Sequence, residues 1–345
     1  MAASAPVRTA LVGFGYAGRT FHAPLIVACP ELRLEALVSR QAEAVAEAWP
    51  QARATASLDE VLADPAIELI VLATPNALHA AQAEAALKSG KAVVVDKPFT
   101  LTADEARRLA ALADERGLLL SVFHNRRWDA DFLTLKALIA EDRLGPVIRL
   151  ESCFNRWRPQ VRDRWREGDG PGAGLWYDLG PHLIDQALCL FGRPLGVTCD
   201  LAILRPGGRA VDYAHVVLRY ADKRIILHAD MVTPAPDARF AVHGARAGWS
   251  KQGLDVQEDQ LKAGLRPGAA GWGVDPRPGV VVDGATGARE VVTGPPGDYL
   301  AYYAAVARAL RGGASNPVPP SEAVAVMEVL EAGLLSAERR AEVAL

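Results

Sequence analysis

The stretch 7-VRTALVGFGYAG-18 joins an apolar run to a turn rich in glycine. Residues 7–12 have the composition of a buried strand, and the next six residues fit the pattern G-x-G-x-x-G. In that pattern the first glycine permits a tight turn, the second lets a pyrophosphate approach the backbone, and the third lets a helix pack closely on the strand. The residues expected to contact a dinucleotide here are Gly13, Phe14, Gly15, Tyr16 and Gly18.

Such a pattern in isolation is often a coincidental glycine turn, so the surrounding secondary structure must show whether it indicates dinucleotide binding. Further apolar runs at 32–38, 67–73, 92–95 and 118–123 are mostly continuous rather than alternating, which is typical of parallel strands covered on both faces. Helical patterns occupy the intervals 41–47, 58–63, 79–88 and 102–116. This repeated alternation predicts an α/β fold that begins with a Rossmann domain, a doubly wound parallel sheet.

Beyond residue 123 the pattern changes. Short polar or glycine turns connect several of the strand-like segments, which predicts an open, mostly antiparallel sheet in a second α/β domain. The expected strands are 147–154, 197–204, 213–220, 224–231, 239–243 and 279–282, and the expected helices are 131–141, 183–191, 298–311 and 321–340. We therefore expect a dinucleotide-binding domain over 1–123 and a substrate-binding and oligomerisation domain over 124–345, with the option that the C-terminal helices pack back onto the first domain.

Composition narrows the class of partner. The chain has 345 residues, half of them apolar, and a formal net charge of -3, which provides no basic field for nucleic acid or anionic lipid. No apolar run is long enough for a membrane span, and residues 1–10 do not resemble a signal peptide, so we expect a cytoplasmic protein that acts on small molecules. The four cysteines lack metal-ligand spacing, and we expect no structural metal.

The end of the second predicted strand bears on the choice of cofactor. NAD sites usually place Asp or Glu there to bind the ribose 2′-hydroxyl, but this chain has Ser39 and Arg40. A hydroxyl and a guanidinium suit a 2′-phosphate, so NADP is the expected cofactor. In the alternative interpretation Arg40 is a solvated residue at a helix start, which leaves NAD possible.

Two further segments follow predicted strands at the ligand-binding edge of the sheet. Thr74-Pro75-Asn76, with His79 close behind, is expected to line the nicotinamide pocket, although His79 alone could be a packing residue. Asp96 and Lys97 follow the next strand, where a lysine can polarise an alcohol or carbonyl oxygen, although a lysine after a strand is more often surface charge.

The segment 172-GAGLWYDLGPHLID-185 places an acid and an imidazole four residues apart. Asp178 could cap a helix whose first turn contains Pro181. A cap explains Asp178 but not His182, and residues four apart on a helix share one face. We therefore expect Asp178 and His182 to face the same cleft.

These motifs together resemble the Gfo/Idh/MocA family of oxidoreductases. The resemblance rests on GFGYAG (13–18), ATPNALH (73–79), VVVDKPFT (93–100) and GAGLWYDLGPH (172–182). The stretches FHAPLI (21–26), SVFHNRRWD (121–129) and RPQVRDRWRE (158–167) are similar to the bacterial branch that includes NADP-dependent scyllo-inositol dehydrogenase.

The resemblance implies three catalytic residues. Lys97 corresponds to the lysine of the family's E-K-P motif, and Asp178 and His182 to its D-x-x-x-H motif; the E-K-P glutamate is replaced by Asp96. The implied general acid/base is His182, assisted by Lys97, while Asp178 holds a substrate hydroxyl or orients the imidazole. The resemblance also implies oligomer contacts through the open sheet, and we expect a homodimer or homotetramer.

Polar and aromatic residues suggest where the substrate binds. Asn125, Arg126 and Trp128 lie where the first domain ends, and Arg162 and Trp165 lie in an arginine-rich stretch, although the first group could simply pin a domain joint. The expected function is an NADP-preferring oxidoreductase of an inositol, sugar or related cyclic polyol. The alternatives are a reductase of another carbonyl or imine, and a non-catalytic dinucleotide-sensing regulator.

Overall fold

The computed structural model describes residues 5–235 and 237–345. The chain divides into two compact units. Unit 1 comprises the chain up to Trp128 together with Gln257–Trp272 and Asp298–Val324. Unit 2 comprises Asp129–Val256, Gly273–Gly297 and Ala325–Leu345.

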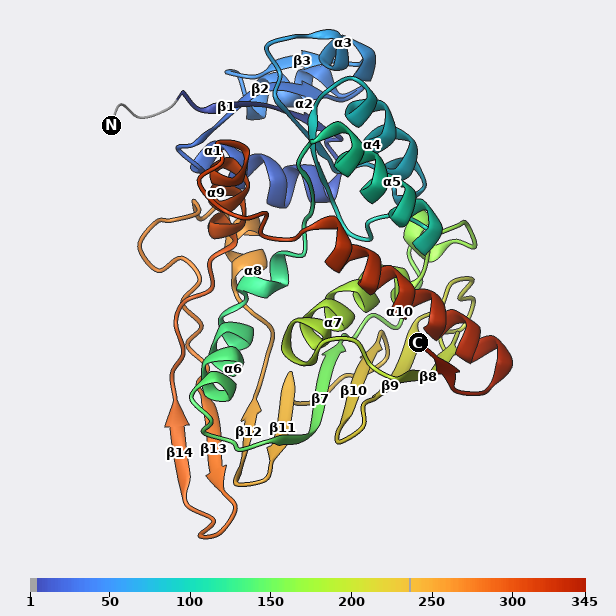
Figure 1. Ribbon diagram of the computed structural model, residues 1–345, viewed down its shortest axis with the longest axis vertical. Helices are drawn as coiled ribbons and strands as arrows, with labels where there is room; N and C mark the ends of the chain where they lie inside the picture. The colour runs from blue at the N-terminus through green and yellow to red at the C-terminus, as the bar shows by residue number, and fades with distance from the viewer. Residues whose placement is uncertain (1–4, 236) are drawn as a thin grey trace. The chain divides into compact units, whose positions relative to one another are not determined.

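Unit 1 contains a six-stranded, fully parallel sheet in the order β3-β2-β1-β4-β5-β6. Figure 1 labels β1, β2 and β3 of this sheet. The strands are β1 (Val7–Val12), β2 (Leu32–Val38), β3 (Arg53–Thr55), β4 (Leu69–Leu72), β5 (Ala92–Val95) and β6 (Leu120–Val122). Every residue of β4 and β5 is buried, as the continuous apolar runs predicted. The doubly wound parallel sheet is therefore confirmed. The edge strand β3 was not predicted, because its three residues form no apolar run.

The helices of unit 1 begin and end on recognisable signals. They are α1 (Ala23–Ala28), α2 (Ala42–Ala48), α3 (Leu58–Ala63), α4 (His79–Lys88), α5 (Ala103–Arg116), α8 (Gln257–Lys262) and α9 (Tyr299–Leu310). Thr102 and Glu105 form a capping box at the start of α5, and Gly117 ends it in the left-handed conformation. A π-helical turn, η1 (Gly18–His22), precedes α1, because Pro24 has no N–H for the regular α-helical bond.

Unit 2 contains a nine-stranded sheet in the order β14-β13-β12-β11-β7-β10-β9-β8-β15. Its strands are β7 (Val147–Asn155), β8 (Gly196–Ala202), β9 (Tyr213–Arg219), β10 (Arg224–Asp230), β11 (Phe240–Gly244), β12 (Ala247–Lys251), β13 (Gly279–Asp283), β14 (Arg289–Val292) and β15 (Val343–Ala344). Within this second sheet, among the pairings of its described strands, only the β7–β10 pair is parallel, which confirms the mostly antiparallel sheet.

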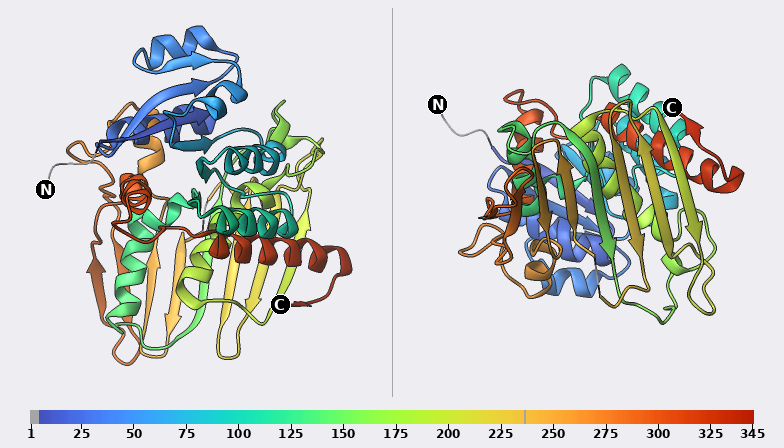
Figure 2. Two further views of the ribbon diagram at one scale, coloured as in Figure 1. Left: turned by 45° about the horizontal axis from the view of Figure 1, so that its top comes forward. Right: turned by 90° about the horizontal axis from the view of Figure 1, so that it is seen from below.

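Helices lie on one face of this second sheet. They are α6 (Ala130–Ala140), α7 (Leu175–Phe191) and the part of α10 (Pro320–Arg339) that belongs to unit 2. The right-hand view of Figure 2 shows the opposite face, which no helix in the described ranges covers. Along β9, half-buried and buried residues alternate, and successive side chains of a strand point to opposite faces of the sheet. The half-buried residues therefore lie on the face without helices.

The start of α7 corrects the expectation of a helix capped by Asp178. The helix begins at Leu175, with Gly174 at the N-cap in a positive-φ conformation (89°), and Asp178 is already helical. Leu175 donates its backbone N–H to the carbonyl of Val211 at 2.7 Å, which anchors the first turn. Pro181 consequently lies inside the helix rather than in its first turn.

Candidate dinucleotide and active site

The three glycines of the turn after β1 have different surroundings. Gly13 has φ +105°, and a Cβ there would lie 2.5 Å from the carbonyl oxygen of Ala73. A Cβ on Gly18 would lie 2.2 Å from the carbonyl oxygen of Gly13. Around Gly15, in contrast, no atom lies within 4 Å of such a Cβ. The first and third glycines are thus required by the protein itself, while Gly15 leaves open space in which a pyrophosphate fits.

Arg19 is a candidate cofactor residue that the sequence-based prediction missed. Its Nε donates to the carbonyl of Phe14 at 2.9 Å, its guanidinium lies over the Phe14 ring, and it also bonds the Gln41 side chain. Gln41 in turn donates its backbone N–H to Ser39 Oγ at 3.0 Å. Arg19 and Ser39 therefore both bond Gln41, and Gln41 directly follows the exposed Arg40. The sequence did contain one indication of a cofactor role for Arg19, which is that this residue directly follows Gly18 of the glycine turn.

Tyr16 and Arg126 are both held by Glu258, which lies in α8. The Tyr16 hydroxyl donates to one oxygen of Glu258 at 2.6 Å, and Arg126 pairs with the other oxygen at 3.1 Å. Burial alone would raise the pKa of Glu258, but Arg126, Tyr16 and Lys262 lower it to about 2. Burial and the bond to Glu258 raise the pKa of Tyr16 to about 12. Glu258 had no motif around it to reveal this role.

The segments after β4 and β5 meet at His79. This side chain is fully buried, with Nδ1 2.8 Å from the carbonyl oxygen of Pro98 and Nε2 2.9 Å from that of Thr74. The Thr74 hydroxyl donates to Gln82 at 2.6 Å. Pro75 is the N-cap of η2 (Asn76–Leu78), in which Asn76 is buried.

Asp96, the residue before Lys97, is buried. Its carboxylate accepts the Lys97 backbone N–H at 2.9 Å and lies 3.6 Å from Nε2 of His22. Burial by itself raises the pKa of Asp96, but His22, Lys97 and His79 bring it below its ordinary value. Lys97 itself is half-buried. Asn125 and Arg126, in η3 (Asn125–Trp128) just after β6, are both buried.

In unit 2, Asp178 and His182 lie one turn apart on α7. The Asp178 carboxylate is close to two guanidinium groups, 3.8 Å from Arg156 and 3.9 Å from Arg166. His182 is buried, at 6% exposure, whereas the side chain of Asp178 is 21% exposed. The structure therefore places these two predicted residues together on one rigid element, while Lys97 belongs to unit 1.

The loop that carries Arg162 and Trp165 is anchored by a buried charge cluster that the sequence-based prediction missed. Arg205 pairs with Glu167 at 3.0 Å and with Asp212 at 2.9 Å, and all three side chains are nearly inaccessible. Glu167 also accepts the Arg162 backbone N–H at 3.0 Å. The Arg162 side chain is exposed, and Trp165, at 40% exposure, lies against Arg166. Both predicted residues thus lie in an exposed part of this loop.

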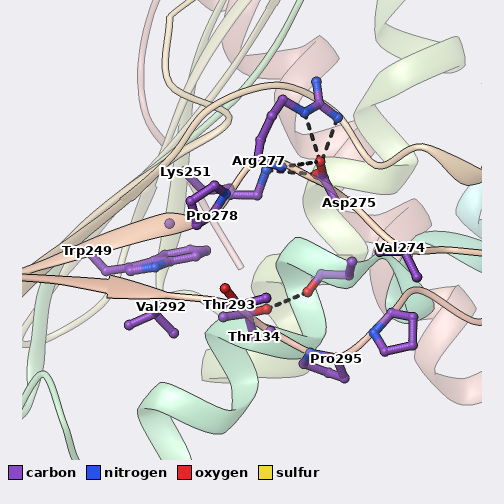
Figure 3. Close-up of a pocket in the computed structure, with 14 residues that line it drawn as sticks. Thr134, Trp249, Lys251, Val274, Asp275, Arg277, Pro278, Val292, Thr293 and Pro295 are labelled. Carbon is purple, nitrogen blue, oxygen red and sulfur yellow. Dashed lines mark hydrogen bonds and ion pairs between the residues drawn. The ribbon is translucent and has the colours of Figure 1, made fainter. Parts of the chain in front are cut away.

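Figure 3 shows a separate hollow in unit 2, between α6 and the strands β12 and β13. A buried Lys251–Asp275 pair at 2.8 Å lies at its wall, and Trp249 lines one side. None of the predicted site residues lines this hollow.

No group of three or more potential metal ligands occurs in the described ranges. Within the same ranges, no helix has the length and apolar character needed to cross a membrane.

A Rossmann sheet with this glycine turn, followed by a second α/β unit, defines the class of two-domain, dinucleotide-binding proteins. Residues 7–124 match the oxidoreductase family described by its NAD-binding Rossmann fold, and residues 136–345 match the C-terminal alpha/beta domain of that family. The chain belongs to the Gfo/Idh/MocA family of oxidoreductases.

Individual relatives agree with this assignment. The chain is 52% identical to the uncharacterized oxidoreductase YdgJ of Escherichia coli, over 98% of this chain and 99% of that protein. It is 38% identical to the Bacillus subtilis scyllo-inositol 2-dehydrogenase (NADP(+)) IolW, over 98% of this chain and 96% of that protein. A solved oxidoreductase from Yersinia pestis is 47% identical, with a TM-score of 0.95 over 99% of this chain and 98% of that one.

Proposed function

We propose that this protein is an NADP-preferring oxidoreductase that acts on a carbinol or keto carbon of an inositol, sugar or related cyclic polyol. The observation that carries the proposal is the presence of Lys97, Asp178 and His182 at the positions that the family's motifs assign to reacting groups. The similarity to IolW, whose name states scyllo-inositol and NADP, supports the choice of substrate class and cofactor.

Each reacting group has a distinct task in this proposal. When bound, the nicotinamide cofactor supplies or accepts the hydride. His182 moves the proton at the substrate oxygen, because imidazole is the side chain that exchanges protons near neutral pH. The Lys97 ammonium donates a hydrogen bond to the same oxygen and stabilises the charge that develops there. Asp178, positioned by Arg156 and Arg166, accepts a hydrogen bond from a substrate hydroxyl.

Three side chains support the preference for NADP: two directly follow β2, and the third, in η1, bonds Gln41 beside them. Ser39 provides a hydroxyl, and Arg40 and Arg19 provide guanidinium groups, which suit a 2′-phosphate. Arg40→Ala and Arg19→Ala should each weaken NADP binding by about tenfold while changing NAD binding much less. Fluorescence titration with both reduced cofactors measures this ratio. Equal losses for NADP and NAD would contradict the assignment.

A second substrate candidate follows from the charges around Asp178. Two guanidinium groups lie near this one carboxylate, so the site carries more positive than negative charge and would also suit a polyol or carbonyl compound with an acidic group. Initial rates with neutral inositols and aldoses, compared with their acidic counterparts, separate the two candidates.

The decisive experiment measures initial rates for inositol isomers, inosose ketones, aldoses and sugar acids with NADP(H) and NAD(H). Lys97→Met and His182→Asn should each lower turnover by at least about a hundredfold and leave cofactor binding nearly unchanged. Near-normal turnover in either variant would overturn the assigned role. Tight cofactor binding without turnover of any substrate would instead favour a dinucleotide-sensing protein.

A further inference from the structure

The two hydrogen bonds of His79 restrict its protonation state. Both ring nitrogens lie within hydrogen-bonding distance of backbone carbonyl oxygens, those of Pro98 and Thr74. A carbonyl oxygen only accepts, so each nitrogen must donate, and only the imidazolium form carries two N–H groups. The side chain is fully buried, so water cannot satisfy a nitrogen that lacks its proton.

The neighbouring Asp96 provides the opposite charge. This carboxylate is buried, and a buried carboxylate requires nearby cations or hydrogen-bond donors. His22 also lies close, but its Nδ1 is 2.6 Å from the Tyr303 hydroxyl, which is able to donate. A neutral His22 can therefore accept from Tyr303 and donate from Nε2 towards Asp96. His79 is thus the histidine whose own hydrogen bonds require the positive charge.

We propose that His79 is an imidazolium positioning residue, paired in charge with Asp96, that ties the segment after β4 to the segment after β5. One nitrogen binds the carbonyl of Thr74, whose hydroxyl is separately held by Gln82. The other binds the carbonyl of Pro98, the residue next to Lys97. His79 thereby fixes the peptide that carries Lys97 relative to the predicted nicotinamide-binding segment. This functional consequence rests on the role proposed above for Lys97.

Two opposing influences act on the charge of this ring. Burial has the largest influence and lowers the pKa of His79, and His22 lowers it further. The Asp96 charge and the two carbonyl oxygens oppose this lowering of the pKa. A neutral ring would place a nitrogen lone pair against a carbonyl oxygen and leave Asp96 with less compensation. The other titratable groups that interact with Asp96 include Lys97, His22, Tyr302 and Tyr303. We expect the two carbonyl acceptors to keep His79 protonated in the native protein, against the lowering of its pKa that burial causes.

Nitrogen NMR of the full-length protein tests the charge directly. The chain has seven histidines, so selective labelling with ¹⁵N-histidine gives few signals. His79→Gln assigns the resonance, and substitution of the other histidines assigns it by elimination if that variant does not fold. The expected spectrum at about pH 7.5 shows two protonated nitrogens for His79, and Asp96→Asn should move its titration to lower pH. A neutral tautomer in the wild-type protein at that pH would overturn the proposal.

Kinetics test whether the charged ring positions Lys97. His79→Gln keeps one amide donor but no charge, and it should lower kcat by about tenfold while changing the dissociation constant of NADP(H) less than threefold. His243→Gln, at an exposed histidine of β11, is the matched control and should leave both unchanged. If the wild type shows imidazolium but His79→Gln keeps its kcat, the positioning role is overturned. The NMR experiment tests the charge of His79 and does not depend on the identity of the substrate. Failure of this proposal can therefore be distinguished from failure of the proposed function.

Discussion

At the residue scale, the glycines after β1 show that one pattern combines two separate requirements. The surroundings of Gly13 and Gly18 exclude any side chain for reasons internal to the fold, whereas Gly15 faces open space. Folding therefore needs the outer glycines, while ligand binding needs the middle one. Variants of Gly15 and Gly18 should consequently fail in different ways.

Gly18→Ala should lower the free energy of unfolding by about 2 kcal/mol or more, because its Cβ would collide with the Gly13 backbone. Gly15→Ala should fold with nearly wild-type stability, since it lies outside the left-handed region and its Cβ meets no atom, but should weaken NADP(H) binding by about tenfold or more. Thermal unfolding and fluorescence titration distinguish the two. Loss of stability in both variants, with binding retained, would contradict this separation.

The lowered pKa of Glu258 predicts how the free energy of unfolding depends on pH. Its pKa is about 2 in the folded protein against an ordinary 4.5, so the stability it contributes is present above pH 4.5 and is lost as the pH falls towards 2. Glu258→Gln should lower the free energy of unfolding by about 2 kcal/mol at neutral pH and flatten its decline over that acidic range. Urea unfolding at a series of pH values measures both effects. Glu43→Gln, at an exposed carboxylate, should change neither.

At the element scale, α7 and the part of α10 in unit 2 pack around one indole. Trp176 donates its Nε1–H to the carbonyl of Leu330 at 3.0 Å. A Cβ on Gly180 would lie 2.8 Å from this ring, and one on Gly333 would lie 2.9 Å from it. Two glycines thus allow the indole to lie between the helices, and this contact supports the helix that carries Asp178 and His182.

Gly333→Ala should therefore lower the free energy of unfolding by about 1–3 kcal/mol, although the same change at an exposed helical position would raise it by about 1 kcal/mol. In a Trp176→Leu background the steric cause is removed, so the added methyl group should cost little or stabilise the helix. Chemical denaturation of the four proteins of this cycle gives the coupling. An equal loss in both backgrounds would contradict the steric explanation.

At the scale of the whole molecule, the helix-free face of the nine-stranded sheet is the expected oligomer surface (Figure 2). Val217 of β9 and Ile226 of β10 are paired on adjacent inner strands of this sheet, and both are half-buried. Ile226→Glu should shift a homodimer or homotetramer towards monomer, because association would desolvate the added charge. Light scattering coupled to size-exclusion chromatography measures this shift. Ala111→Glu, at an exposed position of α5, should leave the mass unchanged, and a monomeric wild type would refute the expectation.

Local patterns in the sequence were sufficient to predict the parallel sheet and one half of the candidate site. Continuous apolar runs alternating with capped helices predict buried parallel strands, because each signal acts within a few residues. The spacing of Asp178 and His182 likewise predicted their common placement on α7, although the helix starts earlier than expected. The strands β3, β12, β14 and β15 escaped prediction, because none of them contains a long apolar run.

Tertiary structure alone decided which distant residues meet. Gln257–Trp272 and Asp298–Val324 join the N-terminal unit, and so Glu258 bonds Tyr16 although 242 residues separate them. The pairing of Arg205 with Glu167 and the bond from His79 to Pro98 arise in the same way. Local sequence encodes helices and glycine turns because their hydrogen bonds join residues a few positions apart, and it indicates buried strands through continuous apolar runs. The partners of buried charges depend on how the elements pack, and no periodicity in the sequence records that packing.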